Sequence, residues 1–277
     1  MYSLLPSTTS TMDEAAVRVA ESDTTTRGVA AKLQTAGRGR LGRVWQTFAW
    51  PHSLAVTYIA HPQAGQAWGP HVPLVVALAL HTAIRQLWAQ APVAIKWPND
   101  ILLHTATGPK KLAGILCQTA PTRHGPPAML VGVGLNLSRP AAGVPESFVG
   151  GFLWAEHAPE EREQGPQAAT GATSALPGAG LAPLAAAAEP PFWMSHLGAC
   201  LFYNLQLYSK YGWAPFHHNY ARHCHTIGQR VSWKSQGNQE LTGTARGLNH
   251  SGHLELVADD GTVHVIHSGE IIAQARA

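Results

Sequence analysis

A change in hydrophobic pattern near Ile227 constrains the fold of this chain more than any other feature. Beyond it lie four short segments of strand-like composition: RVSWK, ELTGTARGL, HLELV and VHVIH. The turn sequences QGN, NHSG and ADDG separate them at short intervals. Closely spaced strands and turns are typical of antiparallel hairpins. We therefore expect residues 226–277 to form a small separate β-barrel or sandwich.

Residues 1–225 mix strand-like and helix-like segments. Runs rich in β-branched residues and bounded by Gly or Pro predict strands, and longer apolar-periodic runs predict helices. The expected strands cover residues 28–34, 53–59, 93–97, 111–119 and 129–137, and the expected helices cover 13–21, 74–88 and 193–208. In the last helix, one face carries Trp193, Leu197, Leu201, Leu205 and Tyr208. The fold class is therefore predicted as α+β, with one large domain preceding the small β domain.

Residues 165–190 differ from both parts. The run GPQAATGATSALPGAGLAPLAAAAEP has Glu189 as its one charged residue and no large side chain that could anchor a core. Its Pro and Gly residues interrupt any helix that the alanines would favour. We interpret this stretch as a flexible surface insertion.

Composition excludes several classes of protein. Hydrophobic residues make up 45% of the chain and charged residues 13%, which favours a globular domain over disorder. The net charge of +3 is too small to require a nucleic-acid partner. Three scattered cysteines do not make a disulfide framework, which favours a reducing compartment. The N-terminus does not resemble a signal peptide, and no apolar run approaches the ~18 residues of a membrane span. We expect a cytoplasmic protein.

The stretch GRGRLGRVW, residues 37–45, matches the dinucleotide fingerprint G-x-G-x-x-G at its three glycines. That fingerprint requires a helix directly after the third glycine and an acidic residue about 20 positions later. The residues RVWQTFAWPHS that follow Gly42 do not begin a helix, and no acid occurs between Arg43 and Asn99. The sequence therefore argues against a dinucleotide site.

Arginines fill the same loop. Arg38, Arg40 and Arg43 provide charged planar forks that match phosphate or carboxylate oxygens. Because three like charges repel each other, we expect the loop to be mobile when free and to be ordered by an anionic ligand. Trp45 offers a stacking face to a base. The alternative is a solvated basic turn.

Three further motifs follow: KWPND, KLAGIL and GVGLN. Pro98 ends a strand, so Asn99 and Asp100 are expected to project beyond the sheet, where Asp100 can hold Mg²⁺ through oxygen. An Asx turn is the alternative. Lys111 opens an apolar strand and needs an anionic partner or a route to solvent. The glycines before Asn136 indicate close approach of a ligand or of another backbone.

In this order, the four motifs GRGRLGRVW, KWPND, KLAGIL and GVGLN resemble the biotin protein ligase family. The resemblance covers about Ser7 to Leu137 and returns more faintly in the C-terminal part. It implies a class II synthetase-like catalytic domain over residues 1–225 and an SH3-like barrel over 226–277. Some members add an N-terminal DNA-binding helix-turn-helix, whereas this chain begins almost directly at the catalytic domain. The resemblance therefore implies an enzyme that does not bind DNA.

The resemblance also implies a chemistry. The family joins biotin to ATP, giving biotinyl-5′-adenylate, and then transfers biotin to one lysine of a biotin carboxyl carrier domain of a carboxylase. ATP and Mg²⁺ are the implied cofactors. The implied biotin site comprises Ser10, Thr11, Gln34, Arg38, Gly39, Arg40 and Lys111. The implied nucleotide site comprises Arg43, Trp45, Asn99 and Asn136, and the implied catalytic residues are Arg38, Arg40, Lys111 and Asp100, with Asp100 as the Mg²⁺ ligand.

The chain departs from the family pattern at several positions. The usual Asp-Ser-Thr-Asn is Thr9-Ser10-Thr11-Met12, the fifth loop position, often Arg, is Leu41, and Gln274 stands where some members have Arg. Two other functions stay open: a lipoate or octanoate ligase or transferase of the same fold, and a non-catalytic homologue that binds the carrier. The sequence does not decide between monomer and homodimer. We expect the carrier to dock by strand addition at a sheet edge.

Two weaker patterns have simpler interpretations. The histidines at 217, 218, 223 and 225 near Cys224 lack a zinc-ligand spacing, and we interpret them as surface groups. The aromatic residues Trp193, Tyr203, Tyr208, Tyr211 and Trp213 are interpreted as core packing.

Overall fold

The computed structural model describes residues 1–62, 67–154, 189–235 and 240–273. The predicted insertion at 165–190 therefore lies outside the described residues except for its last two, and Pro190 is the first residue of a helix. The predicted turn at 236–238 and Gln274 also lie outside them.

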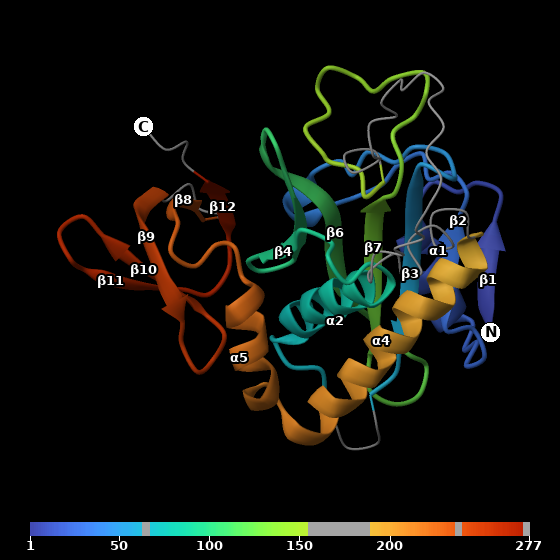
Figure 1. The fold of residues 1–277 in the computed structure, drawn as a ribbon. Coiled ribbons are helices and arrows are strands. Elements are labelled where there is room, and N and C mark those ends of the chain that lie inside the picture. Colours follow the sequence, from blue (N-terminus) through green and yellow to red (C-terminus); the bar gives the residue numbers. More distant parts are fainter. Residues whose placement is uncertain (63–66, 155–188, 236–239, 274–277) are drawn as a thin grey trace, which may run out of the picture.

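A seven-stranded mixed sheet forms the larger part of the fold (Figure 1). Its order is β1-β2-β3-β7-β6-β5-β4, in which β1 and β2 run parallel and every other neighbouring pair is antiparallel. The strands are β1 (Tyr2–Leu5), β2 (Gly28–Ala31), β3 (Ser53–Ala60), β4 (Val93–Lys96), β5 (Asp100–Thr105), β6 (Gly108–Ala120) and β7 (Ala128–Asn136). The five strands predicted in this region are confirmed, and β1 and β5 are additional.

Helix α1 (Thr11–Ala20) covers part of one face of this sheet. Its buried residues Met12, Ala15 and Val19 pack against a small apolar cluster that includes Ile59 of β3 and Leu130 of β7. Because strand side chains alternate between faces, the residues that follow Leu130 on this face are Gly132, Gly134 and Asn136. These small residues leave the rest of this face open.

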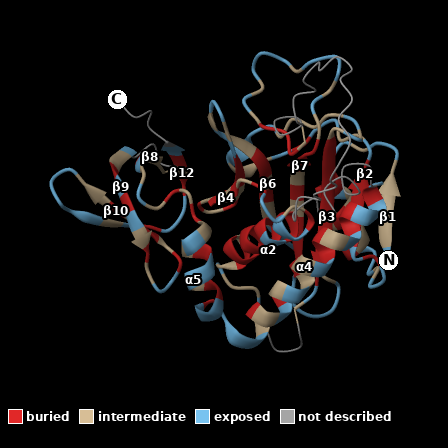
Figure 2. Cartoon of the chain, in the orientation of Figure 1, coloured by how far each residue is buried: buried red, intermediate tan, exposed pale blue. Residues whose placement is uncertain are grey.

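Helices α2 (Val72–Leu87) and α4 (Pro190–Tyr211) cover the opposite face (Figure 2). The predicted stripe on α4 is confirmed, since all five of its residues are buried. Trp193 is fully enclosed. The prediction of core packing is wrong for Tyr203 and Tyr211, because the backbone of α4 turns those two rings outward into solvent.

Helix α5 (Ala214–His223) leads from α4 to the second sheet. This sheet is antiparallel, with the order β11-β10-β9-β8-β12. Its strands are β8 (Arg230–Lys234), β9 (Glu240–Leu248), β10 (Leu254–Ala258), β11 (Val263–Ile266) and β12 (Glu270–Ala273). The mixed α+β fold with a C-terminal β sheet is therefore confirmed, whereas the boundary at residue 226 and the SH3-like closure stay predictions.

The KWPND segment forms a hairpin rather than a free strand end. Asp100 is the first residue of β5 and is the register partner of Lys96 at the end of β4. The prediction that Asn99 and Asp100 project beyond the sheet is therefore wrong for Asp100, whereas Asn99 lies in the turn between β4 and β5. The reason is that Pro98 stops β4, but the chain turns back at once and pairs again.

No helix in the described part of the chain is long and apolar enough to cross a membrane.

Candidate active site

A cavity of about 350 Å³ opens on the α1 face of the large sheet, at the N-terminal end of that helix. All twelve residues predicted for the site line this cavity: Ser10, Thr11, Gln34, Arg38, Gly39, Arg40, Arg43, Trp45, Asn99, Asp100, Lys111 and Asn136. They come from the start of α1, the 37–45 loop, the β4–β5 turn, β6 and β7. Gly269, Glu270 and Ile271 of the second sheet complete the wall.

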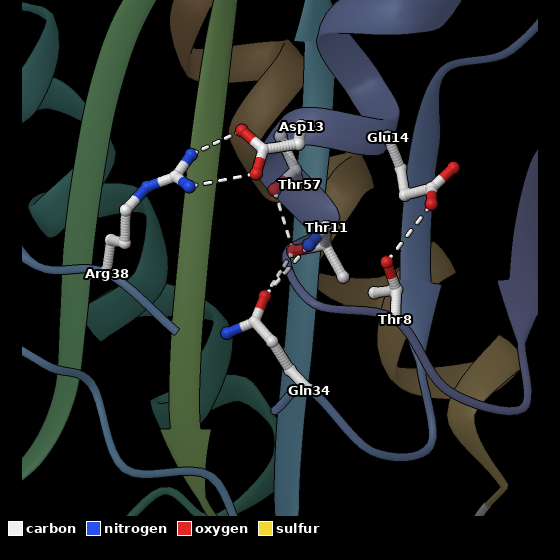
Figure 3. A network of polar contacts seen from close by, with 7 residues as sticks. All are labelled: Thr8, Thr11, Asp13, Glu14, Gln34, Arg38 and Thr57. Atoms are coloured by element: carbon white, nitrogen blue, oxygen red, sulfur yellow. Dashed lines mark hydrogen bonds and ion pairs between the residues drawn. The ribbon is translucent and has the colours of Figure 1, made fainter. Parts of the chain in front are cut away.

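A buried polar cluster lies at the start of α1 (Figure 3). The backbone N–H of Thr11 donates to Oε1 of Gln34 at 2.9 Å, and its hydroxyl lies 3.1 Å from the same oxygen. The Thr11 hydroxyl is also 2.9 Å from the hydroxyl of Thr57 on β3. Ser10 is the N-cap residue of α1, yet its buried hydroxyl makes no capping hydrogen bond. The cluster therefore presents fixed hydroxyl and amide groups to a neutral polar ligand.

The floor of the cavity is a cross-strand pair of glycines. Gly114 of β6 and Gly134 of β7 are register partners, and the indole of Trp45 lies over both. A Cβ on Gly114 would stand 3.0 Å from the Trp45 ring, and one on Gly134 would overlap the ring. The indole nitrogen of Trp45 is buried without a hydrogen-bond partner. The absence of side chains at these two positions therefore leaves room for the Trp45 ring.

A β-bulge aims Lys111 at the cavity. Along β5, Ile101 pairs with Ala113 but Leu102 pairs with Lys111, so Leu112 is an extra residue on β6. Without this bulge, Lys111 would point to the same face as Ala113, opposite Gly114. Instead its side chain lies over Gly114, and its Nζ is 2.9 Å from Oδ1 of Asp100. The predicted anionic partner of Lys111 is therefore Asp100.

Each arginine of the loop has its own partner. Arg38 makes two hydrogen bonds to Asp13 of α1, one of them 2.8 Å long (Figure 3). Arg40 donates to Oδ1 of Asn99 at 2.9 Å, and Arg43 is 2.6 Å from Glu270 of β12. These three partners offset the mutual repulsion of the arginines, and the mobility of the free loop stays a prediction.

Two cations sit in partly desolvated positions. Burial lowers the pKa of Arg40, while the nearby carboxylate of Asp100 raises it. Burial also lowers the pKa of Lys96, again opposed by Asp100. A buried cation gains from any anion that enters the cavity, because the local dielectric is low. The arrangement favours binding of a carboxylate or phosphate between these groups.

Asn99 and Asn136 are both buried and fixed. The Asn99 amide donates to the carbonyl of Ile115 at 2.6 Å while its oxygen accepts from Arg40. Asn136 accepts from the Ser53 hydroxyl at 3.5 Å. Asn99 therefore positions Arg40, and Asn136 lies at the end of the glycine-bearing strand.

Thr57, Lys96 and Glu270 are among the cavity-lining residues that sequence reasoning missed. Thr57 has a usable signal, since it is the polar residue inside the apolar strand SLAVTYIA. Lys96 opens the KWPND motif and also had a signal. Glu270 had none, because its place depends on how the second sheet docks.

The histidines near Cys224 differ in exposure and in their contacts. Within the described ranges, no group of three or more His, Cys, Asp or Glu side chains has metal-binding geometry. His218 is exposed, and His217, His223 and His225 are half-buried. The His223 ring packs against His81, with 4.4 Å between ring centroids. All three cysteines are free thiols.

The chain is similar in sequence to known protein families and to individual characterised proteins. Residues 4–136 match the model of the biotin/lipoate A/B protein ligase family, and residues 226–273 match the biotin protein ligase C-terminal domain. A biotin–[acetyl-CoA-carboxylase] ligase of Paracoccus denitrificans is 31% identical over 88% of this chain and 88% of its own length. One from Mycobacterium tuberculosis is 30% identical over 87% of this chain and 77% of its own.

Among solved structures, the biotin protein ligase of Aquifex aeolicus in complex with biotin and ATP superimposes with a TM-score of 0.72. The match covers 99% of both chains at 19% sequence identity. This level of identity supports the fold alone.

Proposed function

The chain belongs to the biotin/lipoate A/B protein ligase family, and on that premise we propose that it is an ATP-dependent biotin protein ligase. In the first step, a biotin carboxylate oxygen attacks the α-phosphorus of ATP, and the bond to pyrophosphate breaks. In the second, the amine of a carrier lysine loses a proton and attacks the acyl carbon, and AMP leaves. The carrier is proposed to be the biotin carboxyl carrier domain of a carboxylase.

The observation that carries this proposal is the convergence of cations and a neutral polar cluster in one cavity. Arg40, Lys96 and Lys111 line it together with the Thr11–Gln34–Thr57 cluster. Two anions that must react repel each other, and fixed cations offset that repulsion and stabilise charge that develops in the transition state. The polar cluster suits the ureido group of biotin, which offers both donors and an acceptor.

The proposed roles of the site residues agree with their places in the cavity. Ser10, Thr11 and Gln34 are proposed to bind the biotin ring, with Lys111 and the 38–40 segment at its carboxylate. Trp45, Arg43, Asn99 and Asn136 are proposed to bind the nucleotide. The Trp45 ring over its glycine floor supports this, because a flat aromatic surface stacks readily on a base.

Mg²⁺ is the proposed metal, held at Asp100. Asp100 and Glu270 are the carboxylates among the described residues that line the cavity, and Asp100 is already ion-paired through one oxygen with Lys111. This donor set fits Mg²⁺, which is commonly held by one or two carboxylates together with substrate phosphates. When bound, the ion would neutralise phosphate charge. Lys111 and Arg40 then orient the reacting oxygens.

The carrier is proposed to dock by strand addition. The large sheet has edges at β1 and β4. At β4, the carbonyl of Ile95 already accepts from the backbone N–H of His225, which leaves β1 as the more open edge. The free thiols support a reducing compartment, and we propose that the protein acts in the cytoplasm.

Pyrophosphate exchange tests the function. The protein is incubated with ATP, Mg²⁺ and labelled pyrophosphate, together with either biotin or lipoate, and label entering ATP is counted. We expect exchange with biotin and little with lipoate. Exchange with lipoate alone would favour the lipoate ligase alternative, and exchange with neither acid would favour a non-catalytic homologue.

A further inference from the structure

The tip of the 37–45 loop is held to the rest of the protein mainly by arginine side chains. Its base closes as a hairpin, in which the Trp45 N–H donates to the Gly37 carbonyl at 2.8 Å. At the tip, Leu41 and Gly42 take positive φ, and residues 41–44 are exposed. The apolar contact at the tip is therefore small, and its closed position depends on where the guanidinium groups bind.

Arg38 binds a carboxylate that nothing in the sequence motifs singled out. Its two terminal nitrogens contact the two oxygens of Asp13, so the pair is bidentate. Asp13 lies in the first turn of α1, two residues after Thr11 of the buried polar cluster. The ion pair therefore links the helix that carries this cluster to the loop, and it lies beside the cluster at the cavity (Figure 3).

This geometry fixes the Arg38 guanidinium through both of its terminal nitrogens. Each terminal nitrogen gives one N–H to Asp13, so three of the five guanidinium N–H donors, including that of Nε, remain for other partners. Bidentate pairs of this kind have fixed geometry, so they define position as well as charge. The Arg38 hydrogen bonds also lower the pKa of Asp13, so the carboxylate stays charged at neutral pH.

We propose that Asp13 is a positioning residue that holds Arg38, and with it the 37–45 loop, closed over the activated acid. In this chain the Arg38–Asp13 ion pair then links the loop to α1, while Arg40 and Lys111 face the reacting anions. This inference rests on the proposed function for its enzymatic readouts, whereas the contact between Asp13 and Arg38 is a feature of the fold.

Asp13→Asn tests the proposal, because it keeps the size of the side chain and removes its charge. An exposed ion pair of modest strength changes an equilibrium by about two- to five-fold. We therefore expect the variant to release biotinyl-adenylate about two- to five-fold faster and to raise the KM for biotin by a similar factor. The kcat of pyrophosphate exchange should change less than the KM. Asp13→Glu should restore part of the loss.

Glu14→Gln is the matched control. Glu14 is the neighbouring carboxylate in the same turn, but it contacts Thr8 and Arg18 and not the loop. It should leave adenylate release and the KM for biotin unchanged. Equal effects of Asp13→Asn and Glu14→Gln would overturn the proposal, since they would indicate a general effect on α1.

Two further measurements separate this inference from the proposed function. Amide hydrogen exchange of residues 37–45 in the ligand-free protein should be faster in Asp13→Asn than in the native protein, and the difference should shrink in 1 M salt, where charges are screened within about 3 Å. This readout stands even if no biotin exchange occurs. In the Arg38→Gln background, Asp13→Asn should have no further effect on adenylate release or on the KM for biotin. Additive losses in the double variant would refute the proposal that Asp13 acts through Arg38.

Discussion

At the scale of single residues, charge in the cavity is organised as pairs. Lys111 is held by Asp100, and Arg43 by Glu270. Each cation is thereby fixed in place by a carboxylate of the protein, which lowers the cost of ordering it during the reaction. An entering carboxylate or phosphate then adds to, or replaces, a contact whose geometry already exists.

Lys111 is the cation whose removal should matter most. Lys111→Ala takes away the ammonium beside Asp100 and leaves a carboxylate facing the reacting anions. Loss of one positioned donor to a developing charge typically costs about 10²–10³ in rate, so pyrophosphate exchange should fall by at least about 100-fold. Lys110→Ala, on the same strand but outside the cavity lining, is the control. Normal adenylate formation by Lys111→Ala would contradict the role given to this residue.

His81 should make stability depend on pH. Burial, with His223 nearby, lowers its pKa to about 4, whereas an unfolded histidine titrates near about 6.5. Below about pH 6.5 His81 binds a proton in the unfolded chain but not in the folded protein. The stability of the folded protein therefore falls as the pH drops towards 4. At pH 5 this costs about 2 kcal/mol relative to pH 7.

The measurement is urea unfolding at pH 7 and pH 5. His81→Gln should reduce the difference between the two pH values, because the amide does not titrate. His124→Gln, at an exposed position, should keep the native pH dependence. An unchanged pH dependence in His81→Gln would show that His81 is not the group responsible.

At the scale of elements, two irregularities of the central strands build the site. The bulge at Leu112 turns Lys111 to the cavity face, and the facing glycines of β6 and β7 make room for Trp45. A regular strand pair with ordinary side chains would have a closed surface here. The same strands that form the core on the α2 face therefore form a binding floor on the other face.

Gly134→Ala tests this floor. Its methyl group would overlap the Trp45 ring, which must then move away from β7. Stacking of a base on an aromatic ring is worth about 1–3 kcal/mol, so the KM for ATP should rise about tenfold or more. Gly247→Ala on β9 meets open space and is the control. An unaltered KM for ATP in Gly134→Ala would mean that Trp45 does not support the nucleotide.

At the scale of the whole molecule, the two sheets share one apolar core. Leu248, Leu254 and Ile271 of the second sheet belong to the same buried cluster as the residues under α2 and α4. The turn before β10 docks on the larger part, where the indole N–H of Trp97 donates to the Gly252 carbonyl at 3.2 Å. We infer that the C-terminal sheet is a fixed wall of the site and not a loosely tethered module.

Gly252→Val should uncouple the two parts. A Cβ at this position would lie 2.7 Å from Cδ1 of Leu74, and the backbone φ of +72° already disfavours a branched residue. We expect one calorimetric unfolding transition in the native protein and two in the variant. Gly261 has a similar positive φ, but a Cβ there would meet open space. Gly261→Val should therefore lower the stability while keeping a single unfolding transition. A single transition in both variants would argue against the shared core as the source of cooperativity.

The sequence by itself determined most of the order of elements and a set of predicted site residues that share one cavity. Turn signals and strand composition identified the strands that carry a complete local pattern, and they missed the short β1, β5 and β12. Nine of the twelve predicted residues belong to the four motifs, and all twelve line one cavity. The motif residues could be identified because each motif is a short contiguous stretch, and the motifs follow one another in a fixed order along the chain.

Only the tertiary structure decided how those residues are aimed and with what they pair. The bulge that turns Lys111, the carboxylates that hold Arg38 and Arg43, and the place of Lys96 beside Asp100 all depend on register or on contacts between distant segments. A one-residue shift in register reverses the face of every side chain beyond it. No local pattern in the sequence encodes that shift, because it results from the packing of several strands at once.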